Sequence, residues 1–382
     1  MAPPTIIKVV LVPSLPGEAS SSGGGGGGGA APAGEARRVD APNARVVQSV
    51  CACSVGGSVL IAVGGDVGLQ VWDESGSGLL FFWPLPEYTA SPSAPPPPSS
   101  GFVRGLAFNA AAADGPCYAH LCAGTSGSDI AVFEITAAAA GSRGGGAARN
   151  PPSICLAARL AGVHDGGSAV TALGSAFQSR RGGALCEGGE GGGELISADD
   201  GGRVVVWARR AAGGGGGGDY VAAATLEDGG AAAAGVGVRR GLVVVARVDG
   251  AVRIYGLRDG RLRCEIVAHS RWLSALDLHP RRDAFATAAE DCTVSAWTLP
   301  IGDGAGGGGG GGGAGAAAAA AAGAVLLAPP EPLLSAAAVN SVLTGVAWCG
   351  EGCDDLAAAV FDADELLIWR GAGWAGGGAR RP

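Results

Sequence analysis

Two groups of side chains in this sequence have the composition of a catalytic relay. Each contains a histidine, a hydroxyl residue, an aspartate and a tryptophan: His269, Thr287, Asp291 and Trp297 in one, and His164, Ser197, Asp200 and Trp207 in the other. In serine hydrolases a histidine between a carboxylate and a hydroxyl group acts as the general base that activates the nucleophile. That chemistry requires the hydroxyl group to be exposed beside an oxyanion hole.

Both hydroxyl groups lie instead in short apolar runs that have the pattern of strands. Thr287 is within DAFATAA and Ser197 is within ELISA, and a polar turn follows each run. A polar group that is buried without a partner costs about 1 to 3 kcal/mol, so groups of this kind are stabilised by binding one another. The second occurrence also favours a role in the architecture. We therefore interpret both groups as structural hydrogen-bonded networks and predict no catalytic residue.

The runs around these networks recur along the chain. Six times, a tight polar turn with an Asp in or beside it is followed by apolar residues that end on an aromatic residue: Trp72, Phe133, Trp207, Tyr255, Trp297 and Trp369. Tyr255 and Trp297 are 42 residues apart, which agrees with the roughly 40 to 45 residues of a four-stranded propeller blade. The sequence thus predicts an all-β fold of six repeated units, with a core between about residues 44 and 370.

Low-complexity segments interrupt this pattern without adding to it. They are rich in Gly, Ala and Pro and cover residues 20–33, 91–100, 137–148, 188–193, 213–218 and 304–323. Because they bury too little apolar surface to offset their ordering entropy, we expect disordered insertions in a single domain of residues 1–382, with a disordered tail at 371–382. No run for an outer strand follows Trp369, so we expect residues 5–12 to pair with the last unit and close the ring.

Three stretches of the chain resemble the WD-repeat family: HSRWLSALDLHP with the AFATAAEDCTVSAW that follows it, ELISADDGGRVVVW, and DGAVRIYGLRDGRLRCEIVA. The resemblance implies a β-propeller in which the His, hydroxyl, Asp and Trp side chains of a blade form one hydrogen-bonded chain. It also implies a turn glycine where this sequence has Cys292. Rings of this family usually have seven blades, so either this ring has six, or a degenerate or truncated N-terminal blade adds a seventh.

Charge and cysteine usage exclude several classes of function. The net charge of −8 gives no attraction to phosphate backbones or anionic lipids, so we expect neither nucleic-acid binding nor membrane insertion. Ten cysteines occur without a CxxC partner set or a histidine cluster, so we predict no metal site, and no motif calls for a cofactor or small-molecule substrate. Reduced thiols are typical of a cytoplasmic protein. The family resemblance also allows a ciliary or vesicle-associated assembly.

The leading functional prediction is a non-enzymatic scaffold or adaptor that binds other proteins or peptides through the loop faces of the propeller. Residues near the starts of inner strands or in turns are the candidates for a binding rim: Trp272, Arg271, Arg104 and Arg203. Trp and Arg are enriched in interface hot spots, although Trp272 could equally be packed. Two alternatives remain: an enzyme with its site in the central channel, and a reader of modified peptides that uses a basic rim.

Overall fold

The fold was analysed in a computed structural model. It describes residues 6–10, 47–55, 58–76, 78–85, 101–110, 117–136, 152–162, 164, 168–175, 194–209, 220–227, 230–301, 327–349, 353–361, 363 and 365–371. All six predicted low-complexity insertions, and residues 372–382 of the predicted tail, lie outside these residues.

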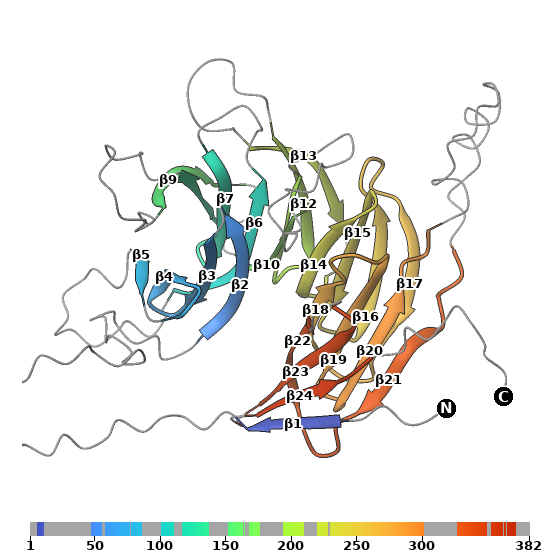
Figure 1. The fold of residues 1–382 in the computed structure, drawn as a ribbon. Helices are drawn as coiled ribbons and strands as arrows, with labels where there is room; N and C mark the ends of the chain where they lie inside the picture. The colour runs from blue at the N-terminus through green and yellow to red at the C-terminus, as the bar shows by residue number, and fades with distance from the viewer. Residues whose placement is uncertain are drawn as a thin grey trace, which may run out of the picture.

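The described chain forms six four-stranded antiparallel sheets, the blades of a propeller (Figure 1). Blade 1 contains β2 (Val47–Val55), β3 (Ser58–Gly65), β4 (Gly68–Asp73) and β5 (Leu79–Pro84). Blade 2 contains β6 (Val103–Ala110), β7 (Cys117–Thr125), β8 (Ile130–Thr136) and β9 (Ser153–Leu160). Blade 3 contains β10 (Val170–Ser175), β11 (Leu195–Asp199), β12 (Arg203–Arg209) and β13 (Tyr220–Glu227). The prediction of an all-β, six-bladed propeller is confirmed.

The second half of the chain repeats this order. Blade 4 contains β14 (Ala233–Arg239), β15 (Leu242–Arg247), β16 (Ala251–Gly256) and β17 (Leu262–Val267). Blade 5 contains β18 (Leu273–Leu278), β19 (Ala284–Ala289), β20 (Thr293–Thr298) and β21 (Pro332–Ala337). Blade 6 contains β22 (Leu343–Cys349), β23 (Asp355–Val360), β24 (Glu365–Trp369) and, from the N-terminal end of the chain, β1 (Ile6–Val10), which pairs with β24. β1 thus supplies the outer strand that the C-terminal sequence lacks.

The turn between the second and third strand of a blade requires a residue with positive φ. Gly202 and Gly250 occupy it in blades 3 and 4, with φ of 83° and 91°. A Cβ atom on Gly250 would collide with the carbonyl oxygen of His269. In blade 5 the same position holds Cys292, with φ of 64°, so this side chain accepts a conformation that normally favours glycine.

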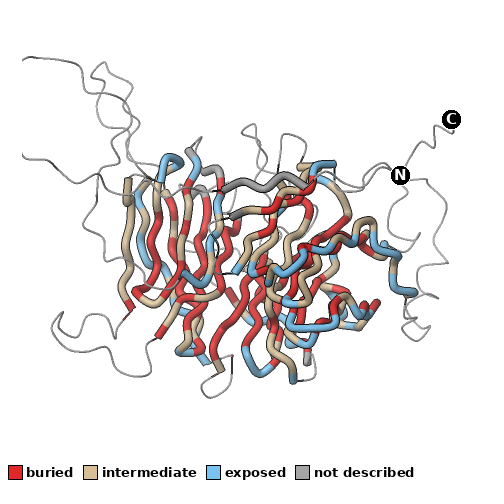
Figure 2. Tube along the Cα trace, turned by 90° about the horizontal axis from the view of Figure 1, so that it is seen from below, coloured by how far each residue is buried: buried red, intermediate tan, exposed pale blue. Residues whose placement is uncertain are grey.

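The core lies between the blades. Each of five clusters of buried apolar side chains spans two consecutive blades, from the pair of blades 1 and 2 to the pair of blades 5 and 6. In Figure 2 the buried positions run along the strands and the exposed ones gather in the turns. Among the described residues, no such cluster joins blade 6 to blade 1.

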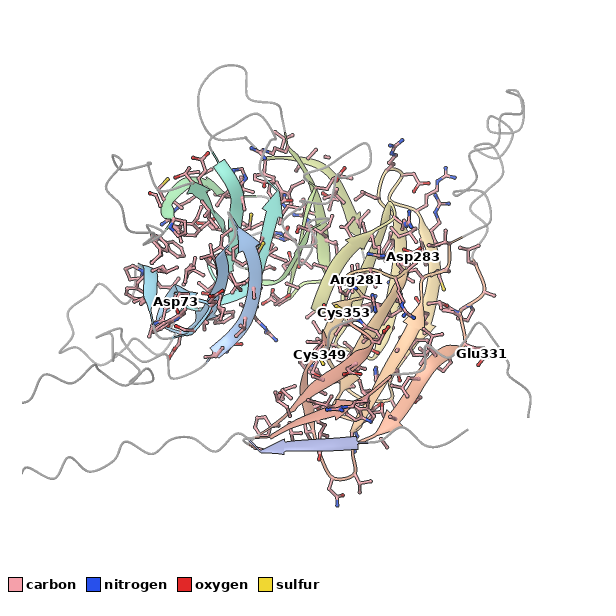
Figure 3. All side chains as sticks on the ribbon, in the orientation of Figure 1. Asp73, Arg281, Asp283, Glu331, Cys349 and Cys353 are labelled. Carbon is pink, nitrogen blue, oxygen red and sulfur yellow. The ribbon has the colours of Figure 1, made fainter. Side chains whose placement is uncertain are left out.

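Eight cysteines in the described part of the chain are free thiols. They include Cys349, at the end of β22, and Cys353, just before β23, both labelled in Figure 3. No helix in the described ranges is long and apolar enough to cross a membrane.

Candidate functional site: the mouth of the propeller channel

In blade 5 the structure brings together the four side chains of the first predicted network. His269 Nε2 lies 2.8 Å from Thr287 Oγ1, and the indole N–H of Trp297 donates to the same oxygen at 3.2 Å. His269 Nδ1 lies 3.2 Å from each carboxylate oxygen of Asp291. Sequence analysis missed Thr293, whose hydroxyl group donates to Asp291 at 2.6 Å and lies 3.0 Å from His269 Nδ1. The sequence contains one signal for the role of Thr293, which is its position two residues after an Asp in a turn.

Blade 3 holds the second network, with one correction. His164 Nε2 lies 2.7 Å from Ser197 Oγ, and the Trp207 N–H donates to Ser197 Oγ at 2.8 Å. The carboxylate at His164 Nδ1 belongs to Asp199, at 2.8 Å, so the assignment of Asp200 to this network is wrong. Successive side chains of a strand point to opposite faces. Asp199, the last residue of β11, points into the blade, whereas Asp200 begins the turn and is exposed.

Neither network has the exposure that catalysis requires. Thr287 and Ser197 are fully buried, and each hydroxyl oxygen already accepts a hydrogen bond from a tryptophan. Burial lowers the pKa of His269, although Asp291 acts to raise it, so the imidazole is neutral at physiological pH. Burial also acts to raise the pKa of Asp291, but hydrogen bonds from Thr293 and Ser270 more than offset this and lower it. The networks therefore hold turns and strands in register.

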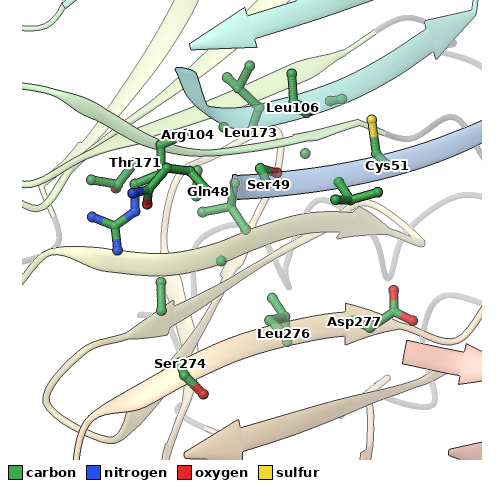
Figure 4. A pocket seen from close by; sticks show the side chains of 18 of the residues that line it. Gln48, Ser49, Cys51, Arg104, Leu106, Thr171, Leu173, Ser274, Leu276 and Asp277 are labelled. Carbon is green, nitrogen blue, oxygen red and sulfur yellow. The ribbon is translucent and has the colours of Figure 1, made fainter. Parts of the chain in front are cut away.

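The six inner strands line a channel of about 720 Å³. Each of these strands has a β-bulge at its second residue, where one extra residue has no cross-strand partner. A bulge re-aims side chains, and all six extra residues line the channel: Gln48, Arg104, Thr171, Ala234, Ser274 and Thr344. Figure 4 shows Gln48, Arg104 and Thr171 at one end of the channel and Asp277 at the other. We call the end with the bulges the mouth.

Two of the bulge residues join neighbouring blades. Thr171 Oγ1 donates to the carbonyl oxygen of Ala233 at 2.9 Å, and Ser274 Oγ donates to that of Leu343 at 2.6 Å. Both acceptors are the first residue of the next inner strand. Arg104 occupies the corresponding position in blade 2 and is the one charged side chain among the six bulge residues. The bulge residues thus form a ring that is polar except at Ala234 and that carries a single cation.

The chemistry of the channel does not resemble an acid–base site. The described lining residues that can ionise are Arg104, Glu290, Asp277, Cys51 and Cys53. Burial raises the pKa of Asp277 to about 7, against hydrogen bonds from main-chain N–H groups, one of them from blade 6 at 2.8 Å. Glu290 lies at the mouth and Asp277 at the opposite end, so the two carboxyl groups do not converge on one reacting atom. Within the described ranges, no group of three or more His, Cys, Asp or Glu residues could hold a metal ion.

Residues 32–307 match the family model described as WDR54. The chain belongs to the WDR54 family. A stretch of 60 residues is 42% identical to mouse WD repeat-containing protein 54 and to rat WD repeat domain 54, and it covers 16% of this chain and 18% of each relative. The matched stretch therefore spans less than a fifth of the length of these relatives.

The WDR54-family chain is also similar to a chain in the crystal structure of the mitotic checkpoint complex. The likeness has a TM-score of 0.50 at 14% identity and covers 88% of this chain and 84% of the other. At this identity it shows the fold alone. WD-repeat propellers are typical protein-interaction scaffolds and are generally non-catalytic.

The mouth of this WDR54-family propeller holds two of the four predicted rim residues. Trp272 lies directly before β18, is 49% exposed and lines the channel, as Arg104 does. Arg271 is exposed in the same connection, but it is not among the described lining residues. Arg203 is half-buried at the start of β12, and its main-chain N–H donates to Asp199 at 2.8 Å. Arg203 therefore supports the blade 3 network.

Proposed function

We propose that this protein is a non-enzymatic scaffold that binds a segment of another protein at the mouth of the channel. The observation that carries the proposal is a half-exposed Trp272 on the same rim as Arg104. A tryptophan side chain that only stabilises the fold is usually largely buried. The family and the fold support the scaffold role in general.

The residues around Trp272 indicate how it is presented. Trp272 is larger than the residues that directly precede the inner strands of four other blades. These are Phe102 in blade 2, Ala169 in blade 3, Ala232 in blade 4 and Val342 in blade 6. The main-chain oxygen of Trp272 accepts a hydrogen bond from Glu290 at 2.9 Å. This bond fixes the backbone that carries the indole, so little entropy is lost when a partner packs against it.

The mouth has a defined chemical preference. An indole face offers a large apolar contact, and a guanidinium group binds carboxylates with two parallel hydrogen bonds. We therefore expect a bound segment to place an apolar side chain on Trp272 and an acidic group at Arg104.

The test is quantitative recovery of partners on the purified protein, read by mass spectrometry. Trp272→Ala should reduce the recovery of the principal partner at least tenfold, which corresponds to about 1.4 kcal/mol or more. Arg104→Gln should reduce it less, and it should make the recovery less sensitive to added salt than in the unsubstituted protein. The matched control is Val267→Ala, an exposed apolar residue on the outer strand β17. Unchanged recovery with Trp272→Ala would exclude the mouth as the binding surface.

A further inference from the structure

The first residue of the inner strand is buried in every blade except one. The strands pair so that Val103, Val170, Ala233, Leu273 and Leu343 occupy equivalent positions in blades 2 to 6, and each is between 0% and 1% exposed. Val47 occupies this position in blade 1 and is 54% exposed. The residue type is the same as in two other blades, so its surroundings cause the difference.

Two of the five formed joints show what covers this residue. A Cβ atom built on Gly64 of blade 1 would lie 2.8 Å from Val103 of blade 2, and one on Gly124 of blade 2 would collide with Val170 of blade 3. A small residue on the second strand of one blade thus receives the apolar residue at the head of the next inner strand. In blade 6 the equivalent small residue is Ala359, which is only half-buried.

A second position of β2 also differs in exposure from the equivalent positions of the other blades. Val50 of β2 is 59% exposed, whereas the equivalent residues of blades 2 to 4, Leu106, Leu173 and Val236, are 7% to 8% exposed. Those of blades 5 and 6, Leu276 and Val346, are half-buried. At the turn after β23, Phe361 is also exposed, although four other blades have a polar residue there: Asp66, Ser126, Asp200 and Glu290. Apolar side chains are therefore uncovered on both blades that border this joint. We call Val47, Val50, Ala359 and Phe361 the seam.

We propose that the seam is the docking site for a β-sheet of another protein, which inserts between blade 6 and blade 1 as an additional blade. Such a sheet would present small residues to Val47 and an apolar head residue to Ala359, as in the joints of blade 1 with blade 2 and of blade 2 with blade 3.

The charge of the seam specifies this occupant further. The strands β2, β3 and β22 contain no charged residue, and β23, which carries Ala359, has one, Asp355 at its first position. A charged surface facing the uncharged strands would be desolvated without a partner, which is costly. The matching sheet is consequently largely apolar on both faces.

The given sequence outside the described residues has no pattern of such a sheet. Its long stretches consist largely of Gly, Ala, Pro and Ser, as in 11–46, 86–100 and 302–326. None of them contains four alternating apolar runs of strand length. For this reason the occupant that we propose is another protein. This inference does not rest on the binding of a segment at the mouth, because it concerns other residues.

The first experiment measures the accessibility of the seam in the purified full-length protein. Val47→Cys and Val103→Cys are matched variants at the same strand position, and their modification by a water-soluble maleimide is followed by peptide mass spectrometry. Val47→Cys should react at least tenfold faster than Val103→Cys. Equal, slow reaction of both would show that blade 6 packs directly on blade 1, and would overturn the proposal.

The second experiment identifies the occupant in cells that express the protein. A photo-crosslinking residue replaces Val50, and the control replaces Val267, which is exposed on β17 far along the sheet from the channel. We expect a cross-link at Val50 alone, to an apolar strand of a β-sheet in another protein. That sheet, produced as its purified protein, should slow the labelling of Val47→Cys at least tenfold.

Several results would overturn the proposal. They are a cross-link from Val50 to this chain or a second copy of it, a cross-link to a helix or a charged segment, or no cross-link above that of Val267. Val50→Asp separates the seam from the mouth, because it should reduce recovery of the cross-linked partner at least tenfold. Trp272→Ala should leave that recovery unchanged. The opposite pattern would place the partner at the mouth.

Discussion

The hydrogen-bonded networks of blades 3 and 5 join the same kinds of side chain but hold their carboxylates differently. In blade 3 Asp199 ends a strand, and its side chain is 2% exposed. In blade 5 Asp291 lies in the turn, and its side chain is 12% exposed. Blade 5 also has Thr293 beside the histidine. A blade therefore needs an acceptor for His Nδ1, and either the strand end or the turn can provide it.

The largest effect should come from removing the buried carboxylate. Asp199→Ala deprives the His164 Nδ1–H and the Arg203 main-chain N–H of their acceptor in the blade interior. One unpaired buried donor and one unpaired half-buried donor should lower the free energy of unfolding by about 3 kcal/mol, measured by urea denaturation.

The adjacent residue is the control for this change. Asp200 is exposed in the turn, so Asp200→Ala should change the free energy of unfolding by less than about 0.5 kcal/mol. If Asp200→Ala proved as damaging as Asp199→Ala, the assignment of the blade 3 carboxylate would be wrong.

The next prediction concerns the pH dependence of the free energy of unfolding. It depends on a second histidine of blade 5, which has surroundings different from those of His269. His279 is buried at the end opposite His269, and its Nδ1 accepts the main-chain N–H groups of Arg281 and Arg282 at 3.0 and 2.9 Å. Burial, and then the charge of Arg282, lower the pKa of His279 to about 4. Its contribution to stability is fully present above the unfolded pKa of about 6.5 and is lost as pH falls through 4. The loss should reach up to about 3 kcal/mol.

A nearby carboxyl group opposes this loss. Burial raises the pKa of Asp277 to about 7, so its contribution is present below the unfolded pKa of about 3.9 and is lost as pH rises through 7. Asp277→Asn should consequently make stability fall more steeply with acid, by about 1.4 kcal/mol per pH unit between pH 7 and 4. Urea midpoints at several pH values measure the slope. An unchanged slope would contradict the pKa direction of Asp277.

Most of the fold could be predicted because each blade is formed by strands that are neighbours in sequence. The run expected to end on Tyr255 lies in β16, and the run expected to end on Trp297 lies in β20. The choice between Asp199 and Asp200 could not be predicted, because adjacent acidic residues differ only in which face of the strand they occupy. The sequence pattern alone assigned Asp200 to the network of blade 3, and this assignment was wrong.

Arg104 and Trp272 were predicted as rim residues, but the β-bulges of the mouth and the exposure of the seam could not be predicted, for a different reason. The bulges that aim Arg104 into the channel depend on how the curved inner strands pair, and no residue type marks them. Val47 and Val103 are the same residue in similar apolar runs, yet one is exposed and the other is buried. Burial at such positions is set by the neighbouring blade, and sequence gives no direct record of it.

A smaller effect is expected from the carboxylate of blade 5. Asp291→Ala removes the acceptor of His269 Nδ1, but the hydroxyl group of Thr293 remains 3.0 Å from that nitrogen and can accept in its place. We expect a loss of about 1 to 2 kcal/mol in urea denaturation, roughly half of the loss for Asp199→Ala. Equal losses in the two blades would show that Thr293 does not compensate.

The smallest effect should come from Thr293 itself. In Thr293→Val the carboxylate of Asp291 still faces His269, so the loss should be only about 1 kcal/mol. Thr298→Val, at the other end of β20, is the matched control and should stay within about 0.5 kcal/mol. The double variant with Asp291→Ala should lose more than the sum of the two single losses, because His269 Nδ1 then lacks both acceptors. Simple additivity would mean that the two groups do not share the histidine, and the contrast with blade 3 would need another cause.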